Sequence, residues 1–146
     1  MVAGLAIMAR YYPEEPLYSL MLLDYYVPVR RLDEAIAALE RLVERLDIVD
    51  AATEARLSAA ALDKGDLQDA SARADVALSL EDDLELAWWS ALKARVALED
   101  FVRATEALQQ LEAQFGWDLG TETLQQDKSY RTLLASSEYQ AWLETR

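Results

Sequence analysis

The chain has 146 residues, 53% of them hydrophobic, which suits a single domain with one buried core. It contains no Cys, no His and no Asn, so disulfides, thiolate nucleophiles, imidazole bases and zinc sites are excluded together. With 27 acidic and 14 basic residues the formal charge is −13, and nucleic acid or an anionic membrane would be repelled. We therefore expect no metal, no cofactor and no nucleic-acid partner.

No stretch of the sequence has the pattern of a signal peptide or a membrane span. Residues 1–8 are apolar, but they lack leading basic residues and a small-residue cleavage site. The run from Leu17 to Val29 contains Asp24 and is well short of the ~20 residues that a membrane helix needs. We expect a cytoplasmic protein without membrane insertion, and a periplasmic location stays open because a chain without Cys suits both compartments.

Helix-forming residues dominate, and the few Gly and Pro residues mark the ends of helices. Apolar residues recur at steps of three and four, and no strict alternation of apolar and polar residues indicates a strand. Gly65 stands where a left-handed turn would end a helix. The predicted helices are Leu32 to Leu46, one that includes Leu57 and ends at Gly65, Leu67 to Leu78, Ala87 to Leu98, and Phe101 to Phe115. These elements predict an all-α fold of helical hairpins.

A sequence pattern recurs at an interval of 34 residues. The segment Gly65-Asp66-Leu67-Gln68-Asp69-Ala70 returns as Glu99-Asp100-Phe101-Val102-Arg103-Ala104, and Arg31-Leu32-Asp33-Glu34-Ala35 is an earlier copy. In each copy a large apolar residue stands three places before an alanine. The bulky side chain can fill the helix pair while the alanine allows close backbone approach. We interpret the copies as three repeats of one helical hairpin.

These residues resemble the tetratricopeptide repeat (TPR), whose first helix typically reads Ala-Trp-x-x-Leu-Gly-x-x-Tyr and whose second follows Gly-x-Tyr-x-x-Ala. Ala87-Trp88 stands at the family's Ala-Trp, Leu57 at its leucine, and Gly65 and Ala70 at its turn and second-helix positions. Ser58 replaces the glycine of the first helix. Leu92 and Arg95 depart at the glycine and tyrosine positions of the third repeat. The resemblance implies a TPR-like α-solenoid, a right-handed superhelical array of antiparallel helix pairs.

With the repeats aligned in this way, the chain is one domain, 1–146, with repeats at 16–50, 51–84 and 85–118. Residues 1–15 correspond to the second helix of an incomplete repeat, which suggests the C-terminal piece of a longer repeat protein. The segment 119–146 is similar to the helical endings that follow many bacterial repeat arrays, and we expect it to cap the last hairpin. Asp127 and either Ser136 or Ser137 can cap its short helices. The covering residues would be Tyr130, Leu133, Leu134, Tyr139, Trp142 and Leu143.

In the TPR family the first helix of each repeat lines a concave groove, and the resemblance carries these positions over. The implied groove residues are Leu17, Leu20, Asp24 and Val27, then Ala52, Ala55, Ala59 and Leu62, then Leu86, Trp89, Lys93 and Val96. A mostly apolar groove suits an amphipathic helix or an extended peptide, with Trp89 as an aromatic anchor. The chain's own tail or a second copy could fill it instead. For Trp88 we expect core packing between repeats.

The acidic cluster Glu81-Asp82-Asp83 with Glu85 lacks the alternating ligands and glycine turn of a calcium loop. We interpret these aspartates as an N-cap and first-turn charges of the following helix. The stretch from Asp47 to Glu85 holds eleven acids and three bases, which could steer a basic partner or form a solvated outer face.

The leading hypothesis is a non-enzymatic scaffold that binds a protein or peptide in the groove. A competing hypothesis is a homo-oligomerisation or interdomain module, because residues 1–12 would form an apolar helix without a hairpin partner. A third hypothesis is an enzyme or small-molecule binder that uses the acid Asp24 beside Tyr25 and Tyr26. The sequence has no Gly-x-Ser-x-Gly motif and no phosphate-binding glycine loop, which leaves only carboxylate, lysine, serine or tyrosine chemistry.

Overall fold

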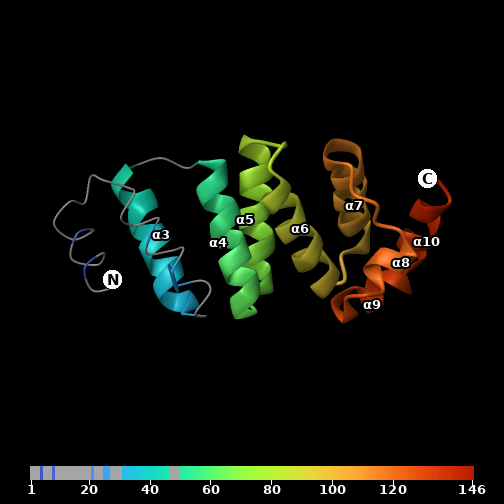
Figure 1. The fold of residues 1–146 in the computed structure, drawn as a ribbon, viewed down its shortest axis with the longest axis horizontal. Coiled ribbons are helices and arrows are strands. Elements are labelled where there is room, and N and C mark those ends of the chain that lie inside the picture. Colours follow the sequence, from blue (N-terminus) through green and yellow to red (C-terminus); the bar gives the residue numbers. More distant parts are fainter. Residues whose placement is uncertain (1–3, 5–7, 9–20, 22–24, 27–30, 47–49) are drawn as a thin grey trace.

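The computed structural model describes residues 4, 8, 21, 25, 26, 31–46 and 50–146, and within these residues every regular element is helical. Figure 1 shows the helices side by side in one row along the long axis of the molecule. Antiparallel hairpins stack on one another along this row, which is the architecture of an α-solenoid. The predicted all-α class is confirmed.

Five helices of 13 to 15 residues form the body of the described array. They are α3 (Leu32–Leu46), α4 (Ala51–Lys64), α5 (Leu67–Leu80), α6 (Glu85–Ala97) and α7 (Phe101–Phe115). The predicted helices over 32–46 and 101–115 have the observed bounds, and the other three differ by a few residues. The hairpins α4–α5 and α6–α7 lie within the ranges 51–84 and 85–118, while the division of the chain into repeats stays a prediction.

The 34-residue spacing reappears in the turns inside the two hairpins. Asp66 and Asp100 each cap the second helix of a hairpin, and their carboxylates accept hydrogen bonds from the backbone N–H of Asp69 and Arg103. Gly65 precedes the first of these caps with φ of 90°, which confirms the predicted left-handed turn. The repeated sequence therefore encodes a repeated turn.

Glu99 takes the position of Gly65 in the second hairpin, and its φ is 60°. A side chain in this left-handed region costs about 1 kcal/mol, which glycine avoids. We expect Glu99→Gly to raise the free energy of unfolding by about 0.5–1 kcal/mol in urea denaturation. The matched control Glu106→Gly, at an exposed position within α7, should lower it by about 1 kcal/mol. Equal losses in both variants would contradict the turn assignment.

Small side chains allow the hairpins to pack closely. Ser58 of α4, at the position of the family's glycine, is buried, and its hydroxyl donates to the Ala70 carbonyl of α5 at 2.6 Å. Two buried clusters each take one alanine from α4, α5 and α6. They consist of Ala55, Ala77 and Ala87, and of Ala61, Ala70 and Ala94. Ala70, the alanine of one copy of the repeated pattern, thus lies where three helices meet.

The segment after α7 forms a cap of short helices, shown in orange and red in Figure 1. They are α8 (Thr121–Leu124), the 3-10 helix η1 (Lys128–Tyr130), α9 (Arg131–Leu134) and α10 (Ser137–Leu143). The predicted caps are confirmed: Asp127 accepts from the backbone N–H of Ser129, and Ser136 accepts from that of Tyr139.

The cap covers the apolar side of α6 and α7. Its buried side chains join one core cluster with Leu108 and Leu111 of α7, in line with the predicted cap on the last hairpin. The same cluster contains Leu92 and Val96 of α6, although Val96 was expected in the groove. Burial raises the pKa of Tyr130 to about 12. The cap residues buried in this cluster are Leu119, Leu124, Tyr130, Leu133, Tyr139 and Trp142, of which Leu119 and Leu124 were not predicted.

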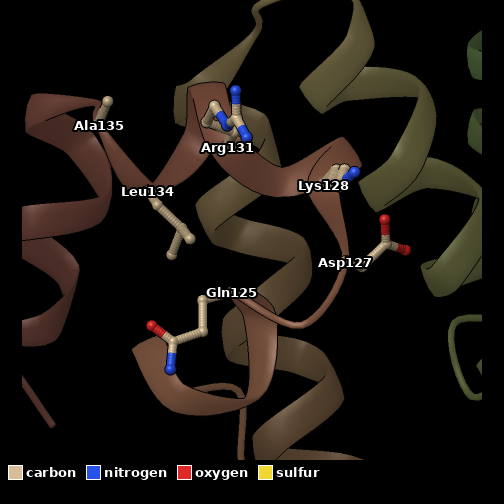
Figure 2. A pocket seen from close by; sticks show the side chains of 6 residues that line it. All are labelled: Gln125, Asp127, Lys128, Arg131, Leu134 and Ala135. Atoms are coloured by element: carbon tan, nitrogen blue, oxygen red, sulfur yellow. The ribbon is translucent and has the colours of Figure 1, made fainter.

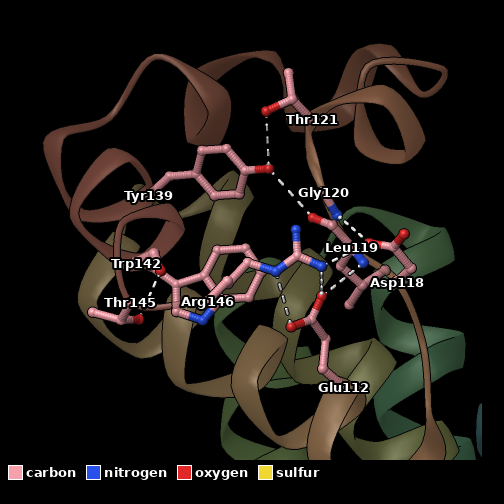
Figure 3. Close-up of polar contacts among 9 residues, drawn as sticks. All are labelled: Glu112, Asp118, Leu119, Gly120, Thr121, Tyr139, Trp142, Thr145 and Arg146. Carbon is pink, nitrogen blue, oxygen red and sulfur yellow. Dashed lines mark hydrogen bonds and ion pairs between the residues drawn. The ribbon is translucent and has the colours of Figure 1, made fainter.

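Polar contacts tie the end of the cap to α7 (Figure 3). The Arg146 guanidinium lies 2.6 Å from carboxylate oxygens of both Glu112 and Asp118, and over the Trp142 ring at 5.1 Å from its centroid. The hydrogen bond from Arg146 holds the pKa of Asp118 below its usual value. The Tyr139 hydroxyl donates to the Leu119 carbonyl at 3.3 Å. The last turn of the chain is therefore fixed against the final hairpin.

Candidate protein-interaction surface

One face of α6 carries three of the predicted groove residues. Leu86, Trp89 and Lys93 follow one another at steps of three and four, so they share a face of the helix. The Leu86 side chain is 44% exposed, Lys93 is exposed and Trp89 is half-buried. Trp89 also packs against the main core cluster, so part of its half-buried ring belongs to the interior, and its role as an aromatic anchor stays a prediction.

Trp117 joins this face from the end of α7. Its ring meets the Trp89 ring edge-on, with centroids 5.2 Å apart and an interplanar angle of 88°. Both indole N–H groups donate to Oε1 of Glu85, at 3.2 Å from Trp89 and 2.7 Å from Trp117. The Trp117 side chain is nevertheless 45% exposed. We call these residues, with Leu86, the tryptophan patch: Glu85, Leu86, Trp89 and Trp117.

Local sequence explains how the tryptophan patch forms. Glu85 stands four residues before Trp89, one turn away on the same helix. Gly116 ends α7 in the left-handed conformation, with φ of 73°, and the next residue is Trp117. Because α6 and α7 are antiparallel, the start of α6 and the end of α7 lie at the same end of the hairpin (Figure 1). Sequence reasoning missed Trp117, although an aromatic residue directly after a helix-ending glycine is a usable signal.

The other predicted groove residues are distributed over different environments. Leu17, Leu20, Asp24 and Val27 lie outside the described residues. On α4, Ala52 is exposed while Ala59 and Leu62 are half-buried. Ala55 and Val96 are 1% and 2% exposed and pack in the interior, so they offer no surface to a ligand. The candidate surface therefore consists of the exposed part of α6 and the residue it meets, Trp117.

The predicted capping role of the aspartates before α6 is wrong. The helix begins at Glu85 with Leu84 at its N-cap, and no side chain caps it. Leu84 packs against the alanine cluster of α4, α5 and α6, which fixes the N-cap one residue beyond Asp83 and the first helical residue two beyond it. The Asp82 carbonyl instead accepts from the Trp88 indole N–H at 2.7 Å. Trp88 packs against the core, as predicted, but the cluster it joins belongs to α6, α7 and the cap and does not lie between repeats.

A partly buried ionic network joins α5, α6 and α7. The Arg95 side chain is 5% exposed and donates to the Arg103 carbonyl at 2.8 Å and to Asp75 at 3.0 Å. Arg103 reaches the same Asp75 oxygen at 2.6 Å. Burial acts to raise the pKa of Asp75, but the hydrogen bonds from Arg103 and Arg95 prevail and hold that pKa below its usual value. Arg95 stands at the tyrosine position of the repeat. In the sequence it is visible only as a departure from the family pattern.

A hollow on the surface of the cap lacks the buried polar side chains that a catalytic or ligand site would need. Its lining residues are Gln125, Asp127, Lys128, Arg131, Leu134 and Ala135. Figure 2 shows Lys128 and Arg131 on one side of it and Gln125 on the other. All six side chains are exposed or half-buried, so the hollow has no desolvated polar group.

The described part of the chain has neither a carboxylate cluster for a metal ion nor a helix that could cross a bilayer. Among residues 31–46, 50–146 and the few described before them, no three carboxylates gather as a metal site would require. No helix formed by these residues is long and apolar enough to span a bilayer.

The fold and the exposed helix face define a helical-repeat protein of the α-solenoid class. No protein-family model and no curated protein sequence matches the chain. Among solved structures, the crystal structure of MamA, a TPR-containing protein, is similar with a TM-score of 0.73 and 17% sequence identity. The similarity covers 98% of this chain and 85% of that one, and it supports the TPR-like fold inferred from the repeats.

Proposed function

We propose that the protein is a non-enzymatic scaffold that binds a segment of a partner protein on the tryptophan patch and the adjoining face of α6. A TPR-like fold is generally suited to protein interaction, and a chain without His and Cys lacks the commonest catalytic groups. The observation that carries the proposal is an exposed apolar surface formed by α6, the first helix of its hairpin, and by Trp117 after the end of α7. Leu86 and Trp117 leave nearly half of their side chains in contact with water.

The patch has the properties of an anchor site. Trp89 and Trp117 are held by hydrogen bonds to one carboxylate, so few rotamers are lost when a partner binds. Tryptophan is enriched among residues that dominate binding energy, particularly where the ring is partly packed beforehand. Lys93 extends the same face by one turn toward the cap.

Replacement of Trp89 by Ala should weaken partner binding by about 2 kcal/mol or more, which is roughly 30-fold in affinity. The measurement is quantitative capture of partners by the immobilised full chain, with circular dichroism to confirm that helicity is retained. Val102→Ala is the matched control, because Val102 is 59% exposed and lies at the opposite end of the same hairpin. Capture that is unchanged by Trp89→Ala would refute the proposed surface.

The competing hypothesis, a self-association or interdomain module, rests on residues 1–12. Apart from Gly4 and Met8, these lie outside the described residues. The hypothesis stays a prediction.

A further inference from the structure

We infer that the tryptophan patch accepts a cationic segment of a partner protein, one in which Lys or Arg stands next to an apolar side chain. This inference rests on the proposed function and specifies the chemistry of the partner. It follows from three properties of the patch: the fixed orientation of its rings, an acceptor left on Glu85, and the sign of the charge around it.

The first property is a rigid aromatic surface. Trp89 and Trp117 meet edge-on, and each indole N–H is hydrogen-bonded to Glu85, so neither ring can turn without losing a bond. Leu86 widens the apolar surface by one exposed aliphatic side chain. An aromatic face attracts a guanidinium or ammonium group, and it also packs against the methylene stem that carries the charge.

The second property is the acceptor on Glu85. Both indoles donate to the same oxygen, Oε1. Within the described part of the chain, no hydrogen bond uses the other oxygen, Oε2. A carboxylate oxygen beside an exposed indole can accept a charge-assisted bond from Lys or Arg while the cation rests on the ring.

The third property is an uncompensated negative charge at this end of the hairpin. Glu81, Asp82 and Asp83 are exposed and directly precede α6, and none of them forms an ion pair with another described residue. Glu112 and Asp118, near the end of α7, differ because both are paired with Arg146. A basic segment is therefore steered to the patch and an acidic one is repelled.

Lys93 does not cancel this charge. It lies two turns along α6 from Glu85, on the side of the cap. The pKa of Asp127 is lowered first by hydrogen bonds from the backbone and hydroxyl of Ser129, and in addition by the charge of Lys93. Lys93 thus faces an acid of the cap.

The charge of the whole chain disfavours a second copy as the occupant. Two molecules that each carry −13 would bring acidic surfaces together at the patch. A free cation is also a poor occupant, since it would leave Leu86 and the apolar part of Trp117 in water. A peptide that combines a positive charge with an apolar residue pairs with the acidic groups of the patch and also covers its apolar side chains.

The test uses the full chain and two labelled synthetic amphipathic peptides, one with Lys and Leu and one with Glu in place of every Lys. Fluorescence anisotropy should show binding of the Lys peptide, weakened by added salt, and no binding of the Glu peptide. Glu85→Gln keeps an oxygen for the indole donors but removes the charge, and Trp117→Ala removes the exposed ring. Each should weaken binding about tenfold or more.

The charge control is the pair Asp63→Asn and Glu106→Gln, two exposed acids away from the patch, which should leave the affinity within about twofold. Equal binding of both peptides, an unchanged affinity in Trp117→Ala, or an equal loss in the control pair would overturn the inference. Concentration-dependent dimerisation that depends on Trp117, seen by light scattering, would overturn it in favour of a second copy. If the Lys peptide fails to bind while partner capture still depends on Trp89, the inference fails and the proposed scaffold function stands.

Discussion

Deletion of residues 121–146 should lower the melting temperature sharply and cause the shortened chain to aggregate. The cap supplies most of the large side chains that cover α6 and α7, and Leu133 and Tyr139 have no exposed surface at all. Removing them would leave Leu108 and Leu111 facing water in a contiguous apolar patch. The short helices of the cap have no stability of their own, since isolated helices under about 12 residues do not persist in water.

A single substitution tests the same contact with less disruption. Leu133→Ala should cost about 2–5 kcal/mol of unfolding free energy, because the side chain is fully buried and leaves a cavity. Thr132→Ala, at the exposed neighbouring position, should change stability by under about 0.5 kcal/mol. Urea denaturation measures both. If Leu133→Ala and the deletion both melt like the full chain, the cap is a tether and its aromatic residues become the better candidate for a binding segment.

Loss of the Asp75 carboxylate should destabilise the protein by about 2–3 kcal/mol. In Asp75→Ala the buried guanidinium of Arg95 keeps its charge but loses its acidic partner, and the cost of a buried unpaired charge exceeds the value of the bond itself. Arg103 is half-exposed and can turn to solvent or to Asp100. Chemical denaturation of the variant at neutral pH measures the loss.

Replacing the buried cation should have a different result. Arg95→Met removes the charge and keeps much of the side-chain volume, and Asp75 retains its bond to Arg103, so the stability change should be under about 1.5 kcal/mol. The control Asp69→Ala breaks a half-buried pair with Arg73, which keeps Glu40 and Glu54 as partners, and it should cost no more than about 1 kcal/mol. An Asp75→Ala loss no larger than that of Asp69→Ala would show that Arg95 is adequately solvated without its partner.

The candidate surface was only partly predictable from the sequence. The family resemblance selected Leu86, Trp89 and Lys93, which lie on one exposed face of α6. It also selected Ala55 and Val96, which are interior residues. A repeat alignment gives the angular position of a residue on its helix, but the neighbouring helices and the cap decide whether that position meets water. Val96 does not meet water because it packs in the core cluster that α6 forms with α7 and the cap.

The sequence alone determined the helices, their turns and the hairpin pattern. These features depend on interactions between residues close in the chain: the three-and-four spacing of apolar side chains, a glycine at the left-handed turn, and carboxylates that cap helices three residues on. The predicted bounds of α3 and α7 and the caps at Asp127 and Ser136 were correct for this reason. The start of α6 was not, because the packing of Leu84 against three helices outweighed local capping.

Only the tertiary structure decided which distant polar and aromatic groups meet. The bond between Trp117 and Glu85 joins residues 32 positions apart, and those of Asp75 with Arg95 and Arg103 span 20 and 28 positions. Such contacts depend on the stacking of whole hairpins, and a displacement of about one helical turn, 5.4 Å, would bring other side chains together. The local pattern predicts which side chains share one face of a helix. The register between helices, which close alanine packing sets, determines which of these side chains meet on a common surface.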